Sequence, residues 1–223
     1  MVIANFVPSA KPILLGNSSA SKCLILIHGL TLSGRQFMPI GEFLLANLGE
    51  DWQIILPTAP TQQVTWMGGQ ITTAWFDLPH GRFDNHQDEA GLNQANAYIQ
   101  SLIDEQIQRG IKHKNIVIGG FSQGGALALL SALTYSNTLG GAVCLSGYLP
   151  MADKLGDFLQ KTDKLNIFIA HGVDDKPIDI SLAQNAVDIL QNNGFEVDFK
   201  TYPMGHTIYE NELNDVVMWL SRY

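Results

Sequence analysis

The chain has few cysteines and few basic residues, and each shortage argues against a class of function. Its two cysteines, Cys23 and Cys144, lie in apolar stretches, which favours buried thiols in a reducing compartment over a disulfide. It contains no C-x-x-C and no H-E-x-x-H, so no motif indicates a metal site. Lysine and arginine number 13 against 21 acidic residues, and the net charge of −8 argues against nucleic acid binding, which needs a basic surface.

The sequence also lacks long apolar runs and internal divisions. No apolar run approaches the roughly twenty residues that span a bilayer. The N-terminus has neither the basic nor the apolar region of a signal peptide. No linker rich in Ser and Pro, no charge run and no repeat divides the 223 residues. We therefore expect one α/β domain over residues 1–223, located in the cytoplasm.

The most informative stretch that is present is NIVIGGFSQGGALALL, residues 115–130. Its apolar, β-branched start predicts a buried strand, and its end predicts a helix. Between them, Gly120 to Gly124 read G-x-S-x-G, a pattern typical of a tight strand-to-helix turn that exposes a serine hydroxyl. The glycines remove side chains that would collide in such a turn. The pattern therefore predicts that Ser122 is a nucleophile.

Apolar periodicity predicts alternating strands and helices along the rest of the chain. Strands are expected at residues 23–27, 52–56, 139–146, 165–170 and 195–202. Helices are expected at residues 36–48, 88–109, 181–190 and 208–220, and two short antiparallel edge strands within residues 1–15. Asp88 and Glu89 are interpreted as a solvated helix start. The alternation predicts a mostly parallel sheet with helices on both faces.

Residues 61–87 lack a clear helical period and are expected to form a long loop, with a small hairpin as the alternative. Loops of this length in compact domains are usually functional. Trp75 and Phe76 are expected in the core. Trp66 and Met67 lie beside two glycines, so we expect them in an exposed flap.

A serine nucleophile needs a histidine base. On sheets that carry the serine on a G-x-S-x-G turn, as α/β-hydrolases do, the order along the chain is serine, acid, histidine, each on a loop after a strand. Only His171 and His206 follow Ser122, and His171 comes before any suitable acid. His206 is therefore the expected base. His28, which follows the first buried strand, is interpreted as a residue that packs and hydrogen-bonds in a turn.

The acid that orients His206 should lie past the end of a strand. Asp174, Asp175 and Asp179 meet this condition. We favour Asp175, three residues beyond the turn expected at residues 171–172, over Asp174, with Asp179 as a third alternative.

The developing oxyanion needs two backbone N–H donors. One is expected from Gln123, directly after the nucleophile. The other is expected from Leu30, in the glycine-bearing loop after the first buried strand.

Several runs together resemble one family of enzymes. The sequence is similar to the phospholipase/carboxylesterase family along nearly the whole chain. The similarity is carried by HGL after the first buried strand, AWFD, DEAGL, GGFSQGGALAL, LSGYLP, HGVDD and GH. That family includes bacterial carboxylesterases and acyl-protein thioesterases. The resemblance implies an α/β-hydrolase core without a large cap, no cofactor, and often a homodimer. Carried over by position, it agrees with Ser122, Asp175, His206, Leu30 and Gln123, and it puts Tyr148 and Pro177 near the acyl pocket.

Two runs depart from the family pattern. The family usually reads H-G-D-x-D-P-x-V-P where this chain reads HGVDDKPID, so Val173 replaces an acid. It usually reads HGLGD where this chain reads HGLTL, so Thr31 replaces a glycine.

The expected function is that of a serine carboxylesterase acting on small or lipid-like esters. The alternatives are an acyl-protein thioesterase that removes palmitoyl groups and, from another class, a non-catalytic binding protein with a hydrolase fold. The flap with Trp66 and Met67 is expected to move over the Ser122 cleft and to make weak peripheral contact with membranes.

Overall fold

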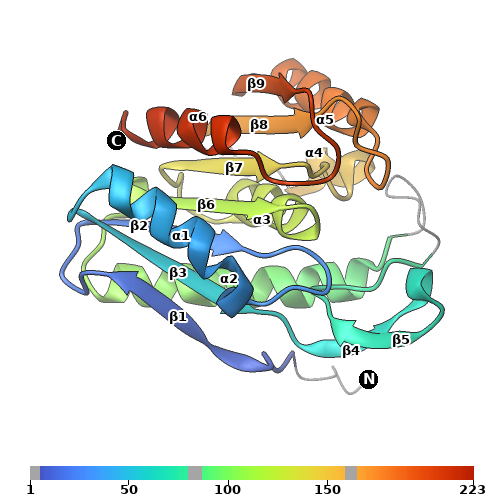
Figure 1. Cartoon of the computed structure of the whole chain (residues 1–223), viewed down its shortest axis with the longest axis horizontal. Helices are drawn as coiled ribbons and strands as arrows, with labels where there is room; N and C mark the ends of the chain where they lie inside the picture. Colours follow the sequence, from blue (N-terminus) through green and yellow to red (C-terminus); the bar gives the residue numbers. More distant parts are fainter. Residues whose placement is uncertain (1–5, 80–86, 159–164) are drawn as a thin grey trace.

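The computed structural model describes residues 6–79, 87–158 and 165–223. One seven-stranded sheet runs through it in the order β1-β3-β2-β6-β7-β8-β9 (Figure 1). The first strand, β1, is antiparallel to β3, and every other neighbouring pair is parallel. The strands are β1 (Ala10–Gly16), β2 (Lys22–Ile27), β3 (Trp52–Thr58), β6 (Ile116–Phe121), β7 (Gly141–Leu145), β8 (Asn166–Gly172) and β9 (Glu196–Tyr202).

Helices cover both faces of the sheet, as the sequence predicts. In Figure 1, α1 (Gly34–Leu48) and α6 (Glu210–Leu220) lie in front of it, and α2 (Glu89–Gln108) and α3 (Gln123–Thr134) lie behind. The side chains of α5 (Ile180–Asn192) join the same core cluster as those of α2 and α3. A short helix, α4 (Leu155–Phe158), precedes β8. None of the helices in the described ranges is both long and apolar enough to cross a membrane.

Continuous apolar runs form the central strands because both faces of the sheet are buried. In β2, Leu24 and Leu26 point into the core beneath α1 and α6. Cys23, Ile25 and Ile27 point into the core shared with α2, α3 and α5. Side chains of a strand alternate between faces, so a strand with two buried faces has few polar positions.

Residues 61–73 form a hairpin, so the expectation of a long loop was wrong and the alternative is correct. Strands β4 (Thr61–Val64) and β5 (Gln70–Thr73) pair antiparallel across a 3₁₀ turn, Thr65–Met67. Gly68 and Gly69 close the turn with φ angles of 67° and 81°, which glycine adopts readily. After the hairpin, Trp75 and Phe76 are buried as predicted. Residues 80–86 of the expected loop lie outside the described residues.

The N-terminal expectation was wrong in part. Within residues 6–15 the structure has one edge strand, β1, where two were expected; residues 1–5 lie outside the described part. Asp88 is more than a solvated helix start. It is the N-cap of α2, and its carboxylate accepts hydrogen bonds from the N–H groups of Gly91 and Asp77, at 3.0 Å each.

Candidate active site

Ser122 lies on a strained turn between β6 and α3. Its φ angle is 57°, in the left-handed region that residues other than glycine rarely adopt. Two close backbone approaches explain the flanking glycines. A β-carbon at Gly120 would lie 2.3 Å from the carbonyl oxygen of Gly124, and one at Gly124 would lie 2.2 Å from that of Ile27. The turn therefore requires the glycines of the G-x-S-x-G motif.

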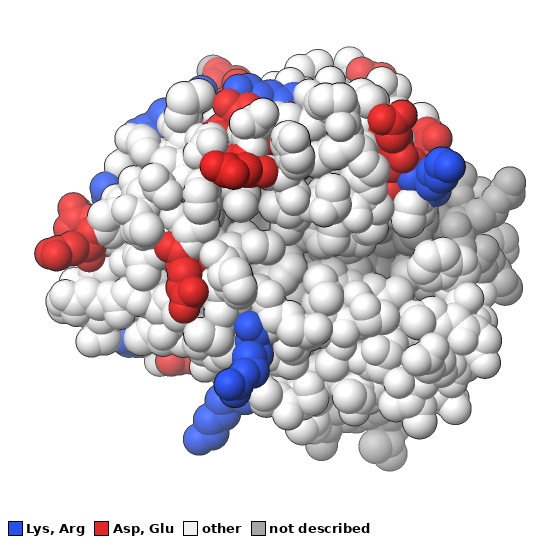
Figure 2. Space-filling view, in the orientation of Figure 1, with Lys and Arg blue, Asp and Glu red and all other residues white. Residues whose placement is uncertain are grey.

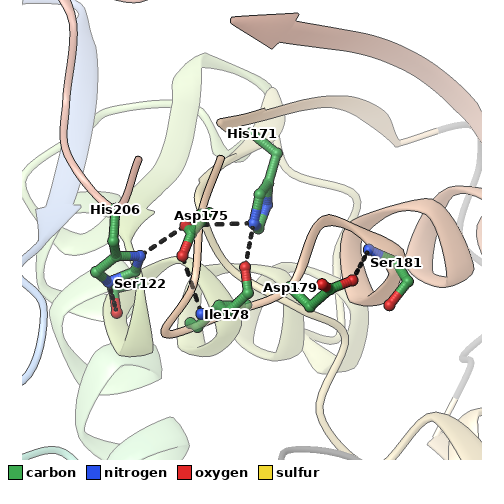
Figure 3. A network of polar contacts seen from close by, with 7 residues as sticks. All are labelled: Ser122, His171, Asp175, Ile178, Asp179, Ser181 and His206. Atoms are coloured by element: carbon green, nitrogen blue, oxygen red, sulfur yellow. Dashed lines mark hydrogen bonds and ion pairs between the residues drawn. The ribbon is translucent and has the colours of Figure 1, made fainter. Parts of the chain in front are cut away.

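Ser122, His206 and Asp175 form one continuous chain of hydrogen bonds (Figure 3). The Nε2 atom of His206 lies 2.9 Å from the Oγ of Ser122. Its Nδ1 atom lies 2.7 Å from the Oδ2 of Asp175. The three side chains come from the loops after β6, β9 and β8, whose carboxyl ends meet at one edge of the parallel sheet. This is the arrangement of a nucleophile, a base and an orienting carboxylate.

The Asp175 carboxylate is completely buried and held by several donors. Its Oδ1 accepts a hydrogen bond from the Ile178 N–H at 2.9 Å. On the side away from His206, the Nε2 of His171 lies 3.4 Å from Oδ2 and 2.8 Å from the Ile178 carbonyl oxygen (Figure 3). Burial lowers the pKa of His171, which favours a neutral ring that donates from Nε2. His171 therefore supports the loop that carries the acid.

The two other candidate acids point elsewhere. Asp174 is exposed, and its backbone N–H bonds the Met204 carbonyl oxygen at 3.0 Å. Asp179 is the N-cap of α5, where its carboxylate accepts from the Ser181 N–H at 2.9 Å. Of the three, only Asp175 contacts the His206 ring.

Leu30 and Gln123, the expected oxyanion donors, line the same cavity as Ser122. Neither the Leu30 N–H nor the Gln123 N–H has a hydrogen-bond partner in the described part of the chain. The Gln123 side chain fixes its own backbone in place. Its Oε1 accepts from the Trp75 N–H at 2.9 Å, and its Nε2 donates to the Phe76 carbonyl oxygen at 2.8 Å.

The loop that carries Leu30 is tied to the hairpin. Thr31 has a φ angle of 68°, the left-handed conformation that a glycine at this position would adopt without strain. Its N–H donates to the Thr73 carbonyl oxygen at 2.9 Å. The hydroxyl of Thr73 in turn donates to the Leu32 carbonyl oxygen at 2.6 Å. These two bonds hold the loop on either side of Thr31.

His28 lies outside the chain of hydrogen bonds, in agreement with its interpretation as a turn residue. Its Nε2 accepts from the Ala59 N–H at 3.0 Å, and its Nδ1 lies 2.7 Å from the Gly29 carbonyl oxygen. Burial lowers the pKa of His28 to about 4, so the ring is neutral at pH 7.

A cavity of about 460 Å³ opens over Ser122 and His206. All four expected pocket or flap residues line it: Trp66, Met67, Tyr148 and Pro177. Leu30, Leu78, Phe121 and Ile178 add further apolar surface. Trp66 is 49% exposed, as expected, and Tyr148 is buried. The expectation of an exposed Met67 was wrong, because its side chain is half-buried against the core. Apart from the reacting groups, the lining suits an apolar chain better than a charged one.

Sequence reasoning missed three supporting contacts of this site. They are His171, whose Nε2 lies 3.4 Å from the Asp175 carboxylate, the hydroxyl of Thr73, and the side-chain amide of Gln123. The spacing of four residues between His171 and Asp175 is a weak signal for the first. Nothing in the local sequence pattern points to the other two.

Comparison with known proteins identifies the family. The sequence model of the phospholipase/carboxylesterase family matches residues 10–223. The chain belongs to this family. As a member, it is a hydrolase with the α/β-hydrolase fold and no large cap, which confirms the fold and the resemblance that the sequence indicates.

Relatives of two kinds are similar to this hydrolase. Carboxylesterase SOBER1 of Arabidopsis thaliana is 34% identical over 203 residues, which cover 89% of both chains. Acyl-protein thioesterase 1 of Neurospora crassa is 34% identical over 208 residues, 89% of this chain and 85% of its own. The crystal structure of SOBER1 matches with a TM-score of 0.84 at 32% identity, over 90% of this chain and 98% of its own. That of Zea mays acyl-protein thioesterase 2 matches with a TM-score of 0.85 at 28% identity, over 95% and 98%.

Proposed function

We propose that the protein is a serine carboxylesterase that hydrolyses small or lipid-like carboxylic esters through an acyl-enzyme. The observation that carries the proposal is the unbroken contact from Ser122 through His206 to the buried Asp175, beside an apolar cavity. The names of the relatives agree with it. In this proposal Trp66, Met67, Tyr148 and Pro177 contact the acyl chain.

The reaction has two steps and needs no cofactor. His206 removes the proton from Ser122, whose oxygen attacks the carbonyl carbon, while the Leu30 and Gln123 N–H groups stabilise the oxyanion. The imidazolium then protonates the leaving alcohol. In the second step, His206 activates a water that releases the acid from Ser122. Asp175 holds the ring in the required tautomer and stabilises its charged form.

The nucleophile is tested by Ser122→Ala. Only residual catalysis of roughly 10³–10⁴ over water should remain, while the fold stays intact. Ser131→Ala is a matched control, because Ser131 is a buried serine on α3 whose hydroxyl has no partner in the described ranges. A fluorophosphonate probe should label the wild type and the control but not the Ser122 variant. Near-normal turnover by a folded Ser122→Ala variant would refute the proposal.

A second candidate function is that of an acyl-protein thioesterase. It is favoured by the apolar cavity and by relatives that bear this name. The same residues would act, with a thiol as the leaving group. Turnover of an acylated peptide, compared with a graded series of simple esters, separates the two. A strong preference for long-chain acyl peptides would establish the thioesterase.

We also propose peripheral contact with membranes through the hairpin. Its turn and second strand expose two large apolar side chains, Trp66 at 49% and Ile71 at 67%. Apolar side chains in this position gain free energy by entering a lipid interface, where tryptophan is favoured. In this proposal the segment around Trp66 moves aside when it meets lipid and so opens the Ser122 cleft.

Liposome binding tests this contact. The other tryptophans, Trp52, Trp75 and Trp219, are buried, so a blue shift of fluorescence on adding liposomes would report Trp66. Trp66→Ala should weaken liposome binding more than it slows a short soluble ester. Met218→Ala, exposed on α6, is the control. Unchanged spectra and binding would show that Trp66 is an ordinary loop residue.

Two further expectations concern the domain organisation and the oligomeric state of the protein. We propose that residues 1–223 form one cytoplasmic domain and that the protein forms a homodimer, as the family resemblance implies. The seven-stranded sheet and the family match over residues 10–223 support the first part. Light scattering in solution tests the second.

A further inference from the structure

A second hollow, of about 360 Å³, adjoins the cavity over Ser122. The two share only Leu32, Phe121 and His206. The rest of the second hollow, called here the α1–α6 groove, is lined by Gln36, Phe37, Ile40, Thr207, Ile208 and Leu213. None of the described residues that line the groove is a lysine, arginine, aspartate or glutamate. In Figure 2, the area right of and below the centre, where Figure 1 places β4 and β5, shows no charged side chain among the described residues, so the hairpin side of this face is uncharged as well.

The two hollows belong to opposite faces of the sheet. In the cavity over Ser122, Leu30 and Met67 pack against the core shared with α2, α3 and α5. In the α1–α6 groove, Ile40 and Ile208 pack against the core beneath α1 and α6. In a substrate that occupies both hollows, the two halves must therefore separate beside His206 and Phe121, which belong to both linings.

The chemistry determines which half of the substrate each hollow can hold. The carbonyl carbon must contact Ser122, and its oxygen must reach the N–H groups of Leu30 and Gln123. All three residues line the first cavity and none lines the groove. The acyl chain therefore belongs in the first cavity. The leaving atom must lie next to His206, which lines both hollows.

We propose that the α1–α6 groove binds the apolar part of the departing alcohol or thiol. This inference rests on the proposed function. In the step concerned, the bond between the carbonyl carbon and the leaving oxygen or sulfur breaks as the tetrahedral intermediate collapses. Its electron pair goes to the leaving atom, which takes the proton from His206 Nε2. The groove holds the alkyl or aryl group attached to that atom, so the enzyme selects esters that are apolar on both sides of the scissile bond.

Two ester series test the proposal on the wild-type enzyme. In the first, the acid is always acetate and the alcohol grows from methyl to butyl to hexyl, so the basicity of the leaving group changes little. We expect kcat/KM to rise by about two- to fourfold per added methylene, as burial of apolar surface predicts. In the second series, the alcohol is always methanol and the acid grows. A flat response to alcohol length, with turnover still dependent on Ser122, would refute the groove and leave the proposed function standing.

Variants on the two walls localise the effect. Ile40→Asn, on α1, and Ile208→Asn, before α6, should each flatten the response to alcohol length and lower hexyl acetate turnover much more than methyl acetate turnover. Their response to acid length should keep the wild-type slope. Trp66→Ala should flatten the response to acid length and keep the wild-type slope for alcohol length. Met218→Asn, which replaces an exposed residue of α6, should change neither slope. If both groove variants keep the wild-type slope for alcohols, the leaving group binds elsewhere. Circular dichroism of each variant shows whether it is folded. Because the two substitutions lie on different walls of the groove, a shared effect is not explained by local misfolding of one segment.

Discussion

Glu212 provides a pH-dependent test of the structure. Its side chain is completely buried in α6. The Oε2 atom accepts from the Tyr209 N–H at 3.3 Å, and Oε1 has no partner within the described residues. Burial raises the pKa of Glu212 from 4.5 to about 8. The carboxyl is therefore protonated in the native protein at neutral pH and ionised in the unfolded chain.

The direction of the effect follows from this difference. Between pH 4.5 and pH 8 the native state binds one more proton than the unfolded state, so the free energy of unfolding falls as the pH rises. At 1.36 kcal/mol per pH unit, the loss is about 4 kcal/mol between pH 5 and pH 8, and it levels off above the native pKa. Glu212→Gln keeps the shape of the side chain and cannot ionise, so it should escape this loss.

Thermal unfolding at pH 5, 7 and 9 measures the effect. A change of 1 kcal/mol shifts the Tm of a chain of this size by about 2–4 °C. The Tm of Glu212→Gln relative to the wild type should therefore rise by about 10 °C between pH 5 and pH 9. Glu210→Gln is the matched control, because Glu210 is exposed in the same helix. Parallel Tm curves for the wild type and Glu212→Gln would refute a protonated, buried Glu212.

Three further predictions concern catalysis. In steady-state kinetics, Asp175→Asn should lower kcat by about 10⁴, whereas Asp174→Asn should have little effect. Equal losses would show that Asp175 is not the specific partner of His206. Leu30→Pro removes a backbone N–H and should lower kcat by roughly 10²–10³, while Leu30→Ala should mainly alter the pocket. A folded proline variant with normal kcat would place the second oxyanion donor elsewhere. Thr73→Val removes the hydrogen bond to the loop that carries Leu30 and should lower kcat about fivefold at unchanged KM, whereas Thr73→Ser should keep the rate. A serine variant as slow as the valine variant would contradict the role of the hydroxyl.

The features that the sequence predicts well are those with strong local patterns. Strand β2 is an unbroken apolar run from Cys23 to Ile27, and the turn at Ser122 is marked by glycines whose β-carbons would collide with backbone. The order of Ser122, Asp175 and His206 along the chain is the one found on α/β-hydrolase sheets. For these features, the local pattern and the tertiary structure agree.

The sequence indicated the hairpin only as the alternative to a long loop, because its strands carry almost no pattern. TQQV and QITT are short and mostly polar, so neither shows the alternation of a half-buried strand. Tertiary contacts hold the hairpin instead, including the Thr73 hydroxyl on Leu32 and the Trp66 N–H on the Leu78 carbonyl oxygen. The α1–α6 groove escaped prediction for a related reason, because its lining comes from separate segments that only the fold brings together.

The position of β9 at the edge of the sheet links activity to partial opening of the molecule. In the part of the chain that the structure describes, this strand pairs with β8 alone, and most of its side chains are partly or fully exposed. His206 follows it, and the bond from His206 to Ser122 joins residues 84 positions apart in the chain. Edge elements with few buried contacts open at lower free energy than the core of a protein. As denaturant increases, hydrolysis should therefore disappear while Trp52 and Trp75 are still buried, so that a loss of activity reports the release of one strand rather than the unfolding of the protein.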